Sequence, residues 1–391
     1  MPTDYETELA RIDRDLAGES TGVTADLSPA MQAMLHASRL YQRASLTGDL
    51  VALDAADAAA DAAIAQTRVP DDLYLLKAQI AMKLHRLDEV RRNLDAVPAL
   101  RETPDGMALL ADVDFQEGRY DEARRGYEAA IARDRTWDAL ARLAHVAGKM
   151  DDAAAADRLY AEAEDELTAK QMRSYAWVQL QRGTLDVAEG RLDDAAAHYD
   201  RAARAYSGYW LVDEHVAALT AARHDMDAAI ARYEDVVARV PKPELKQTLG
   251  ELYAAAGQRE RAQPLLEQAQ SAYLDSVARG GVHYYHHLTD LYAGPLDAPA
   301  EAVRWARMDL ALRRNFNTLA ALAWALHRAG DAAEASDTMA EALASGVNDA
   351  HLYAHAATIF RAAGRTDEGE RAAKRAGGAH HHHGHFHVHH H

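Results

Sequence analysis

Apolar and small residues recur at helical spacing along most of the chain, and turns that contain glycine interrupt them. The stretch Pro243–Ala269 shows the pattern: Gly250 and Tyr253 lie on one helical face, Gly257 breaks the helix, and Ala262 begins a second face. Side chains three or four residues apart share one face of a helix. The spacing therefore predicts a helix-turn-helix hairpin of about 34 residues, a length typical of helical repeats.

Turns of this kind recur along the chain. The order glycine, polar, apolar, acidic, acidic, alanine occupies residues 118–123 and 190–195, and related turns begin at Gly148, His224, Gly257, Gly330 and Gly364. The step from 257 to 330 spans two units because a variant turn lies at Gly294. The longest single step, from 148 to 190, predicts a helix extension around residues 165–174.

The N-terminal part of the chain fits the same scheme less regularly. Apolar residues at helical spacing from Leu9 to Leu16 predict a short amphipathic helix. A serine cap followed by proline predicts a helix over Pro29–Thr47, and the alanine-rich residues 50–66 predict its return helix. Residues 71–97 predict a second hairpin, with its turn at His85 and Arg86.

Together these elements predict an all-α fold. Small residues such as Gly250 and Ala262 let paired helices approach closely, and stacking of hairpins supplies the core that one hairpin lacks. We therefore expect an α-α superhelix (solenoid) of about nine to ten hairpins over residues 28–376. An acidic segment with a short helix, residues 1–27, precedes it, and a flexible histidine-rich tail, residues 377–391, follows it.

The charge balance narrows the classes of partner. The 61 acidic and 43 basic side chains give a formal net charge of −18, which repels nucleic acid and anionic membranes and favours cationic partners or metal ions. No segment approaches the roughly 20 apolar residues of a membrane span, and no signal peptide is evident. We therefore expect a cytoplasmic protein with no nucleic acid partner and no membrane insertion. The lack of cysteine excludes disulfides and cysteine nucleophiles.

Catalytic signatures are missing from the sequence. It contains no glycine-rich phosphate loop with its lysine, no HExxH zinc motif and no GxSxG nucleophile elbow. Its many Asp and Glu residues lie on polar helices, where solvated carboxylates are expected. The sequence therefore favours a protein that is not an enzyme and requires no cofactor.

The hairpins resemble the tetratricopeptide repeat. The residues that carry the resemblance are Trp137, Leu140, Ala141, Leu249, Gly250, Tyr253, Ala229, Tyr233 and Pro241. The likeness covers roughly residues 29–376. Lys77 and Arg182 stand where leucine is usual, and Asp157 stands where a large apolar residue is usual, so we expect irregular units there.

The resemblance implies a concave groove that holds a protein or peptide partner and is lined by fixed positions of each first helix. Carried over unit by unit, these positions fall on Phe115, Arg135, Asp138, Arg142, His145, His283, His286, Asp290, Asn317, Trp324, His327, His351 and Arg361. The hairpin at Pro243–Ala269 is one of the plainest units, and the resemblance places Glu244, Gln247 and Glu251 on its groove face. We therefore expect recognition to concentrate in the histidine- and aromatic-bearing units after it.

Histidines cluster within the array. His283 with His286 or His287, and separately His351 with His355, have the i,i+3 or i,i+4 spacing that places metal ligands on one helix face. The alternative is ordinary groove and core histidines, which we favour because such short patterns arise by chance.

The tail after Gly377 is a second candidate metal site. Its ligands would be His380, His381, His382, His383, His385, His387, His389, His390 and His391. Neutral imidazole ligates Ni(II), Zn(II) and Cu(II), with copper bound most tightly. A purification tag would have the same chemistry, but the interruptions at Gly384, Phe386 and Val388 favour a native segment.

Three functions fit these features. The first is a non-enzymatic scaffold or adaptor that binds a protein or peptide in its groove. The second is metal handling, in which the tail sequesters or delivers nickel, zinc or copper while the repeats dock a client. The third is an accessory subunit that positions an enzyme's substrate. Partner identity, the preferred metal and the oligomeric state stay open at this level.

Overall fold

Antiparallel helix pairs make up almost all of the described chain. The computed structural model describes residues 1–18, 27–150 and 152–377, and within these ranges the chain forms 21 α-helices and one short 3-10 helix, with no strand. Helix α1 (Asp4–Leu16) precedes ten hairpins.

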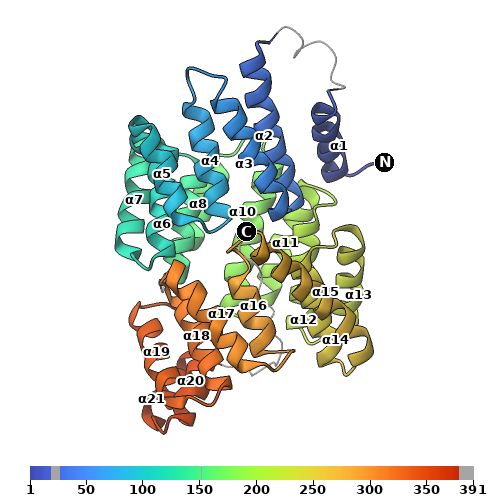
Figure 1. The fold of residues 1–391 in the computed structure, drawn as a ribbon. Coiled ribbons are helices and arrows are strands. Elements are labelled where there is room, and N and C mark those ends of the chain that lie inside the picture. The colour runs from blue at the N-terminus through green and yellow to red at the C-terminus, as the bar shows by residue number, and fades with distance from the viewer. Residues whose placement is uncertain (19–26, 151, 378–391) are drawn as a thin grey trace.

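The first helices of the hairpins are α2 (Pro29–Thr47), α4 (Asp71–Lys83), α6 (Pro104–Gln116), α8 (Trp137–Lys149), α10 (Met172–Ala188), α12 (Trp210–Ala222), α14 (Pro243–Ala255), α16 (Tyr285–Ala293), α18 (Phe316–Arg328) and α20 (Ala350–Ala362). The second helices are α3 (Leu50–Ile64), α5 (Leu87–Ala96), α7 (Tyr120–Arg133), α9 (Ala153–Asp165), α11 (Leu192–Ala205), α13 (Met226–Arg239), α15 (Arg259–Ala278), α17 (Pro299–Leu312), α19 (Ala332–Ala344) and α21 (Thr366–Arg375), and η1 (Pro98–Glu102) follows α5. The predicted all-α superhelix of hairpins is confirmed (Figure 1). Apart from Gly377, the predicted tail lies outside the described residues.

Local sequence signals explain where these helices begin and end. The side chain of Ser28 accepts a hydrogen bond from the backbone N–H of Met31, and Pro29 occupies the first helical position, as predicted. Most hairpin turns contain one residue in the left-handed conformation, which is glycine at six of them and His85, His224 or Asp297 at three others.

Two details of the predicted turns are wrong. Gly148 lies inside α8, because that helix continues to Lys149 before the chain turns. The long step after it does not extend α9, which ends at Asp165. Instead the extra residues form a connection over 166–171 and lengthen α10, which begins at Met172 and has 17 residues.

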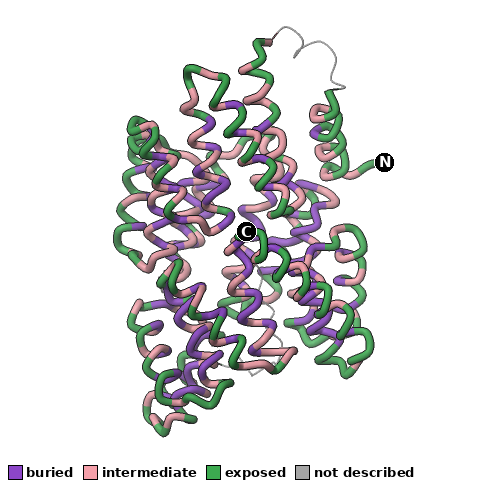
Figure 2. The backbone as a smooth tube through the Cα atoms, in the orientation of Figure 1, coloured by how far each residue is buried: buried purple, intermediate pink, exposed green. Residues whose placement is uncertain are grey.

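The first helices form an inner layer and the second helices an outer one. Neighbouring hairpins contact one another through their first helices, for example α16 with α18 and α18 with α20, while each second helix packs on first helices. Buried residues accordingly concentrate between the layers, and exposed residues cover the outer helices and the turns (Figure 2). This arrangement places the predicted groove positions on the inner layer.

The superhelix returns on itself after about six hairpins, because the ends of early first helices meet the starts of late ones. The Trp210 indole N–H donates to the carbonyl of Leu46 at 3.0 Å, and the Asn315 side chain donates to the carbonyl of Gln116 at 2.8 Å. The backbone N–H of Asn348 donates to the carbonyl of Lys149 at 2.9 Å. We call this line of contacts the seam.

Helix α1 docks across the seam as well. It forms as predicted, but it is held by residues about 200 positions later. The backbone N–H of Tyr5 donates to the carbonyl of Ser207 at 3.1 Å, and Asp4 accepts a hydrogen bond from the Ser207 hydroxyl at 2.6 Å. Ile12, which is 1% exposed, belongs to the same apolar cluster as Leu46 and Trp210. The N-terminal helix therefore joins the first and sixth hairpins.

Candidate partner-binding surface

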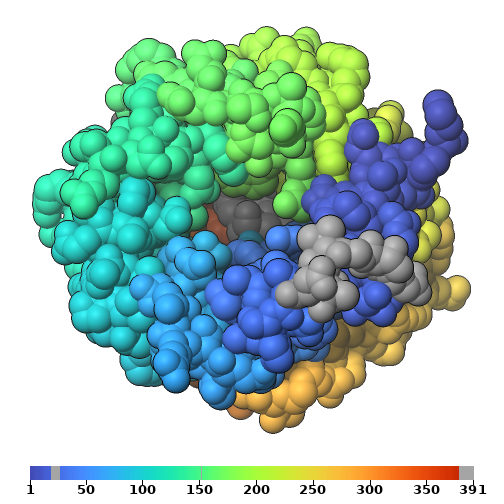
Figure 3. Space-filling model, turned by 90° about the horizontal axis from the view of Figure 1, so that it is seen from above, coloured from blue at the N-terminus to red at the C-terminus, as the bar shows by residue number. Residues whose placement is uncertain are grey.

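The hairpins surround a central opening. Seen from above, they form a closed ring, with the N-terminal hairpins stacked over the C-terminal ones (Figure 3). The first helices form the inner layer, so most of the predicted groove positions lie on the helices nearest this opening. Two parts of this inner surface differ sharply in chemistry.

The first part carries four carboxylates from three consecutive first helices. We call it the acidic wall: Glu214 of α12, Glu244 and Glu251 of α14, and Asp290 of α16. Glu214 and Glu244 are only 2% and 1% exposed. Both carboxylate oxygens of Glu244, and one of Glu214, are buried without a hydrogen-bond partner. Burying a carboxylate that lacks such a partner is costly, so this wall offers acceptors that a donor group would satisfy.

Burial raises the pKa of two carboxyl groups of the acidic wall, Glu214 and Glu251. It raises the pKa of Glu214 to about 7, and nearby Glu244 adds to this effect while Lys242 opposes it. Burial also raises the pKa of Glu251 to about 8, opposed by a hydrogen bond that the Gln247 amide donates at 2.9 Å. Lys242 itself lies 4.5 Å from the ring centre of Trp210. The Lys242 ammonium therefore lies near both the Trp210 ring and the Glu214 carboxyl group.

The second part carries aromatic rings from the last two first helices. We call it the imidazole–indole wall: Trp324 and His327 of α18, and His351 and His355 of α20. The Trp324 and His355 rings are stacked, with centres 4.0 Å apart and planes inclined by 8°. His327 lies 5.3 Å from Trp324, and His351 lies 4.3 Å from His355. The structure thus brings together three side chains that the repeat resemblance predicted, from two neighbouring hairpins.

Other predicted groove residues have different neighbours. Phe115, which is 9% exposed, packs against Tyr120, His145 and Phe316 and so belongs to the seam. The interpretation of Phe115 as an open lining residue is therefore wrong, because the later turn of the superhelix covers it. Burial lowers the pKa of the neighbouring His145 to about 3.

Ion pairs occupy the charged candidates in α8 and just before it. Arg142 pairs with Asp112 and, at 2.9 Å, with Asp138. Arg135 turns towards the outer layer, where it pairs with Glu162 and Glu166 at 2.6 and 2.8 Å. Asn317 and Arg361 are exposed at the two ends of their helices. Whether these residues bind a partner stays a prediction.

The internal histidine cluster lies where α16 begins, beside the seam. His283 is 3% exposed, neither of its ring nitrogens has a hydrogen-bond partner, and burial lowers its pKa to about 4. His286 lies 4.0 Å from His287 and 5.9 Å from His85 of the earlier turn. Within the described ranges, no group of three His, Asp or Glu side chains is arranged to hold a metal ion.

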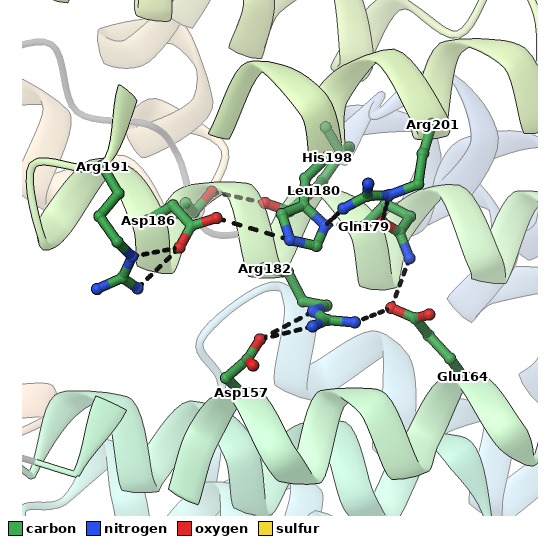
Figure 4. A network of polar contacts seen from close by, with 10 residues as sticks. Asp157, Glu164, Gln179, Leu180, Arg182, Asp186, Arg191, His198 and Arg201 are labelled. Atoms are coloured by element: carbon green, nitrogen blue, oxygen red, sulfur yellow. Dashed lines mark hydrogen bonds and ion pairs between the residues drawn. The ribbon is translucent and has the colours of Figure 1, made fainter. Parts of the chain in front are cut away.

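The departures from the repeat pattern are explained by pairs of charges between neighbouring hairpins. Arg182 pairs with Asp157 at 2.8 Å and with Glu164 at 2.6 Å, within a network that continues to Gln179 and His198 (Figure 4). Lys77 likewise pairs with Asp57 at 2.7 Å and Asp61 at 2.8 Å. Each unusual residue therefore has a partner on the preceding second helix, and both units still form hairpins.

Sequence reasoning missed Glu214 and undervalued its neighbours on α14. Glu214 lies three residues before the small residue Ala217, the same offset that separates Gln247 from Gly250 and Asp138 from Ala141. That offset could have identified it. The expectation that residues 243–269 form one of the plainest units is also wrong, because Glu244 and Glu251 are buried with neighbouring carboxylates.

Comparisons with known proteins bear on the fold. No family model matches the chain, and no curated protein matches it. The fold itself is a superhelix of antiparallel helix pairs. Among solved structures, a chain of the APC/C hetero-tetramer Cut9–Hcn1 shares 14% identity, with a TM-score of 0.49 over 95% of this chain and 80% of that chain.

Two further structures resemble shorter parts of it. A tetratricopeptide repeat protein from Parabacteroides merdae ATCC 43184 shares 16% identity, with a TM-score of 0.37 over 61% of this chain and 91% of its own. MamA shares 18% identity, with a TM-score of 0.32 over 43% of this chain and 96% of its own. These likenesses concern the fold alone. No described helix is long and apolar enough to cross a membrane.

Proposed function

We propose that this protein is a non-enzymatic adaptor that holds a segment of another protein on the inner surface of its superhelix. The observation that carries the proposal is the acidic wall, where buried carboxylate oxygens of Glu214 and Glu244 lack hydrogen-bond partners. A surface that only filled the core would not retain such costly groups. The wall suits a partner segment that supplies lysine or arginine donors.

The rings of the imidazole–indole wall complement this charge recognition. Trp324 and its three histidine neighbours can pack against apolar or aromatic side chains of the same segment. Binding would then combine a few ring anchors with charge pairing. The formal net charge of −18 supports a cationic segment and disfavours nucleic acid. A cytoplasmic location is part of the same proposal.

Quantitative capture from cell extract tests this function. The full chain is immobilised, and captured proteins are compared with those held by a variant in which Glu214, Glu244 and Glu251 become glutamine. A matched control removes three exterior charges by Asp88→Asn, Asp193→Asn and Asp337→Asn, at sites 88%, 102% and 85% exposed. We expect one partner to be retained by the wild type and the control, and lost from the glutamine variant.

A second variant tests the rings independently. The double variant Trp324→Ala, His327→Ala should bind the same partner at least tenfold more weakly, as measured by titration of the purified pair. Capture that survives both the charge and the ring variants would show that the inner surface is not the binding site.

Metal binding by the tail is a separate proposal that rests on the sequence. Nine histidines among residues 380–391 provide ligands for Ni(II), Zn(II) or Cu(II), and these residues lie outside the described part of the chain. Calorimetry of the full chain against each ion, with a variant in which the nine histidines become serine as control, tests it. Loss of micromolar binding in the serine variant would support the proposal, whereas unchanged heats would exclude it.

A further inference from the structure

The seam joins four successive early hairpins to later parts of the chain. The hydrogen bonds of Trp210, Asn315 and Asn348 hold the first, third and fourth hairpins. The second hairpin meets the start of α16 through aromatic rings instead, because the ring centre of His85, in its turn, lies 5.9 Å from that of His286. This part of the seam therefore depends on imidazoles contributed by an early and a late hairpin.

Two imidazoles of this contact are buried without compensation. His283 is 3% exposed, and neither of its ring nitrogens has a hydrogen-bond partner within the described part of the chain. The same holds for the buried Nδ1 of His85. A neutral ring tolerates such a site, whereas an imidazolium carries two N–H groups and a charge that require water or an acceptor. The contact therefore favours uncharged rings.

The charged neighbours of His85 strengthen this preference. Burial lowers the pKa of His85 well below its usual range, and the charges of Arg313 and His283 add to this effect. Arg313 belongs to the late hairpins, where it pairs with buried Asp309 at 2.8 Å and lies 3.4 Å from Nδ1 of His286. A proton on His85 would therefore be repelled across the seam.

His283 is surrounded by charges of both signs. Burial lowers its pKa to about 4, while Asp54 opposes this effect and Arg86 and Arg279 add to it. Asp54 and Arg86 belong to the early hairpins and pair with each other at 2.8 Å. The Tyr284 ring lies 4.2 Å from the His283 ring on its own side of the seam. The carboxylate beside His283 is thus already paired with a guanidinium.

We propose that the seam is an acid-sensitive closure, in which protonation of His85 and His283 separates the second hairpin from α16 and opens the ring. A histidine exposed by opening titrates near about pH 6.5. Because the closed seam lowers the proton affinity of both rings, closure is favoured above that pH and is lost as pH falls towards 4. Between pH 7 and pH 5, protonation of His283 alone should raise the ratio of open to closed molecules about twentyfold. This inference does not depend on the proposed function.

Hydrogen exchange of two seam donors measures the opening in the full chain. The probes are the indole N–H of Trp210 and the backbone N–H of Asn348, each of which donates across the seam. Their exchange is followed by NMR at pH 7 and pH 5, relative to the rate of the same group in the unfolded chain at each pH. We expect both probes to lose protection at least tenfold at pH 5, while circular dichroism shows that the helices are retained.

Two variants identify the groups that titrate. His85→Asn with His283→Phe removes both imidazoles, and asparagine tolerates the left-handed backbone of His85, whose φ is 56°. This double variant should lose protection less than threefold. The matched control is His215→Gln in α12: His215 is also 3% exposed, and burial lowers its pKa to about 4, but it packs on Tyr199 of the preceding hairpin. The control should keep the full loss of protection.

A single change decides the question if the double variant does not fold. His283→Gln should shrink the loss of protection at the seam at least fivefold. Undiminished loss in both variants that lack His283, or no loss in the wild type, would overturn the inference. So would a control in which His215→Gln shrinks the loss as much as His283→Gln, because the probes would then report unfolding of the whole molecule.

Discussion

The acidic wall and the imidazole–indole wall belong to the same inner layer, yet they change the stability of the fold in opposite directions. The rings of Trp324 and His355 are stacked on each other, so that wall contributes to stability. The carboxylates of Glu214 and Glu244 are buried with oxygens that lack hydrogen-bond partners, so that wall costs stability. A candidate binding surface in a repeat protein can therefore be recognised by the folding stability that it costs as well as by the contacts that it makes.

The two walls also differ in how the scaffold supports them. The imidazole–indole wall uses the regular repeat offset of two adjacent first helices, α18 and α20. The acidic wall lies near the seam, where the α2–α3 turn approaches Lys242 and Trp210. Changes at the seam should therefore affect the molecule more than changes within either wall.

The largest expected effect is at Gly118, where the seam holds hairpins of different turns together. Its φ is 78°, and an added Cβ would lie 2.5 Å from the carbonyl oxygen of Arg314. Gly118→Ala should lower the free energy of unfolding by about 3 kcal/mol, measured by chemical denaturation. The matched control is Gly190→Ala, with φ 74° and no atom within 4 Å, which should lose only about 1 kcal/mol. Equal losses would show that the seam adds no stability.

The next effect is at Trp324, and it tests whether the ring wall stabilises the fold. Trp324→Ala removes the stacked partner of His355 and should cost about 2–3 kcal/mol in thermal or chemical unfolding. Trp324→Phe keeps a ring and should recover at least half of that loss. If the alanine variant is as stable as the wild type, the stacking is not a stabilising contact.

The pH dependence of stability separates the buried carboxyl groups from the buried histidines by sign. Glu214 and Glu251 have folded-state pKa values raised to about 7 and about 8, so the folded protein binds more protons than the unfolded chain above about pH 4.5. Stability should therefore fall as pH rises from 6 towards 8, by about 2 kcal/mol between pH 6 and 7. Glu251→Gln should flatten this alkaline limb.

Buried histidines lower the stability of the fold at acidic pH instead. Burial lowers the pKa of His215 and His283 to about 4, so the unfolded chain binds more protons below about pH 6.5. Stability should therefore also fall as pH drops from 6.5 to 4. A denaturation series across pH should show a maximum near pH 6, and a monotonic rise with pH would contradict the role of the acidic wall.

The smallest effect is a gain of stability at Glu244. Glu244→Gln removes a buried charge while keeping the shape of the side chain, and it should raise the free energy of unfolding by about 1 kcal/mol. Glu301→Gln on the exterior, where the side chain is 48% exposed, should change it by less than about 0.5 kcal/mol. A loss of stability at Glu244 would show that the carboxylate is well compensated in the folded protein.

The sequence predicts the hairpins well because each depends on residues close together in the chain. Small residues at the helix crossings and left-handed turn residues such as Gly257 are local signals, and they give the element order and the inner positions Trp324, His327 and His351. The seam lies beyond such signals. Gln116 and Asn315 meet across 199 residues, and that contact depends on small rotations accumulated over six hairpins.

The errors in the predicted site have the same origin. Phe115 has the repeat offset of a lining residue, but the later turn of the superhelix buries it against Phe316. Glu214 was not singled out, and Glu244 was assigned to an ordinary groove position, but packing around the seam buries both. Local pattern therefore predicts which helix a side chain lies on, while the return of the superhelix decides what surrounds it.

The docking of α1 also has a consequence for how the chain folds during its synthesis. Asp4 and Tyr5 are made first, yet Ser207, to which both bond, is made about 200 residues later. Until the sixth hairpin is synthesised, α1 lacks its hydrogen-bond partner Ser207, and the first hairpin lacks its contact with the Trp210 indole. A stack of repeats can normally fold by propagation from any unit, with mainly local contacts. Here the ring closes late, so the finished protein should unfold as one body rather than fray from its ends.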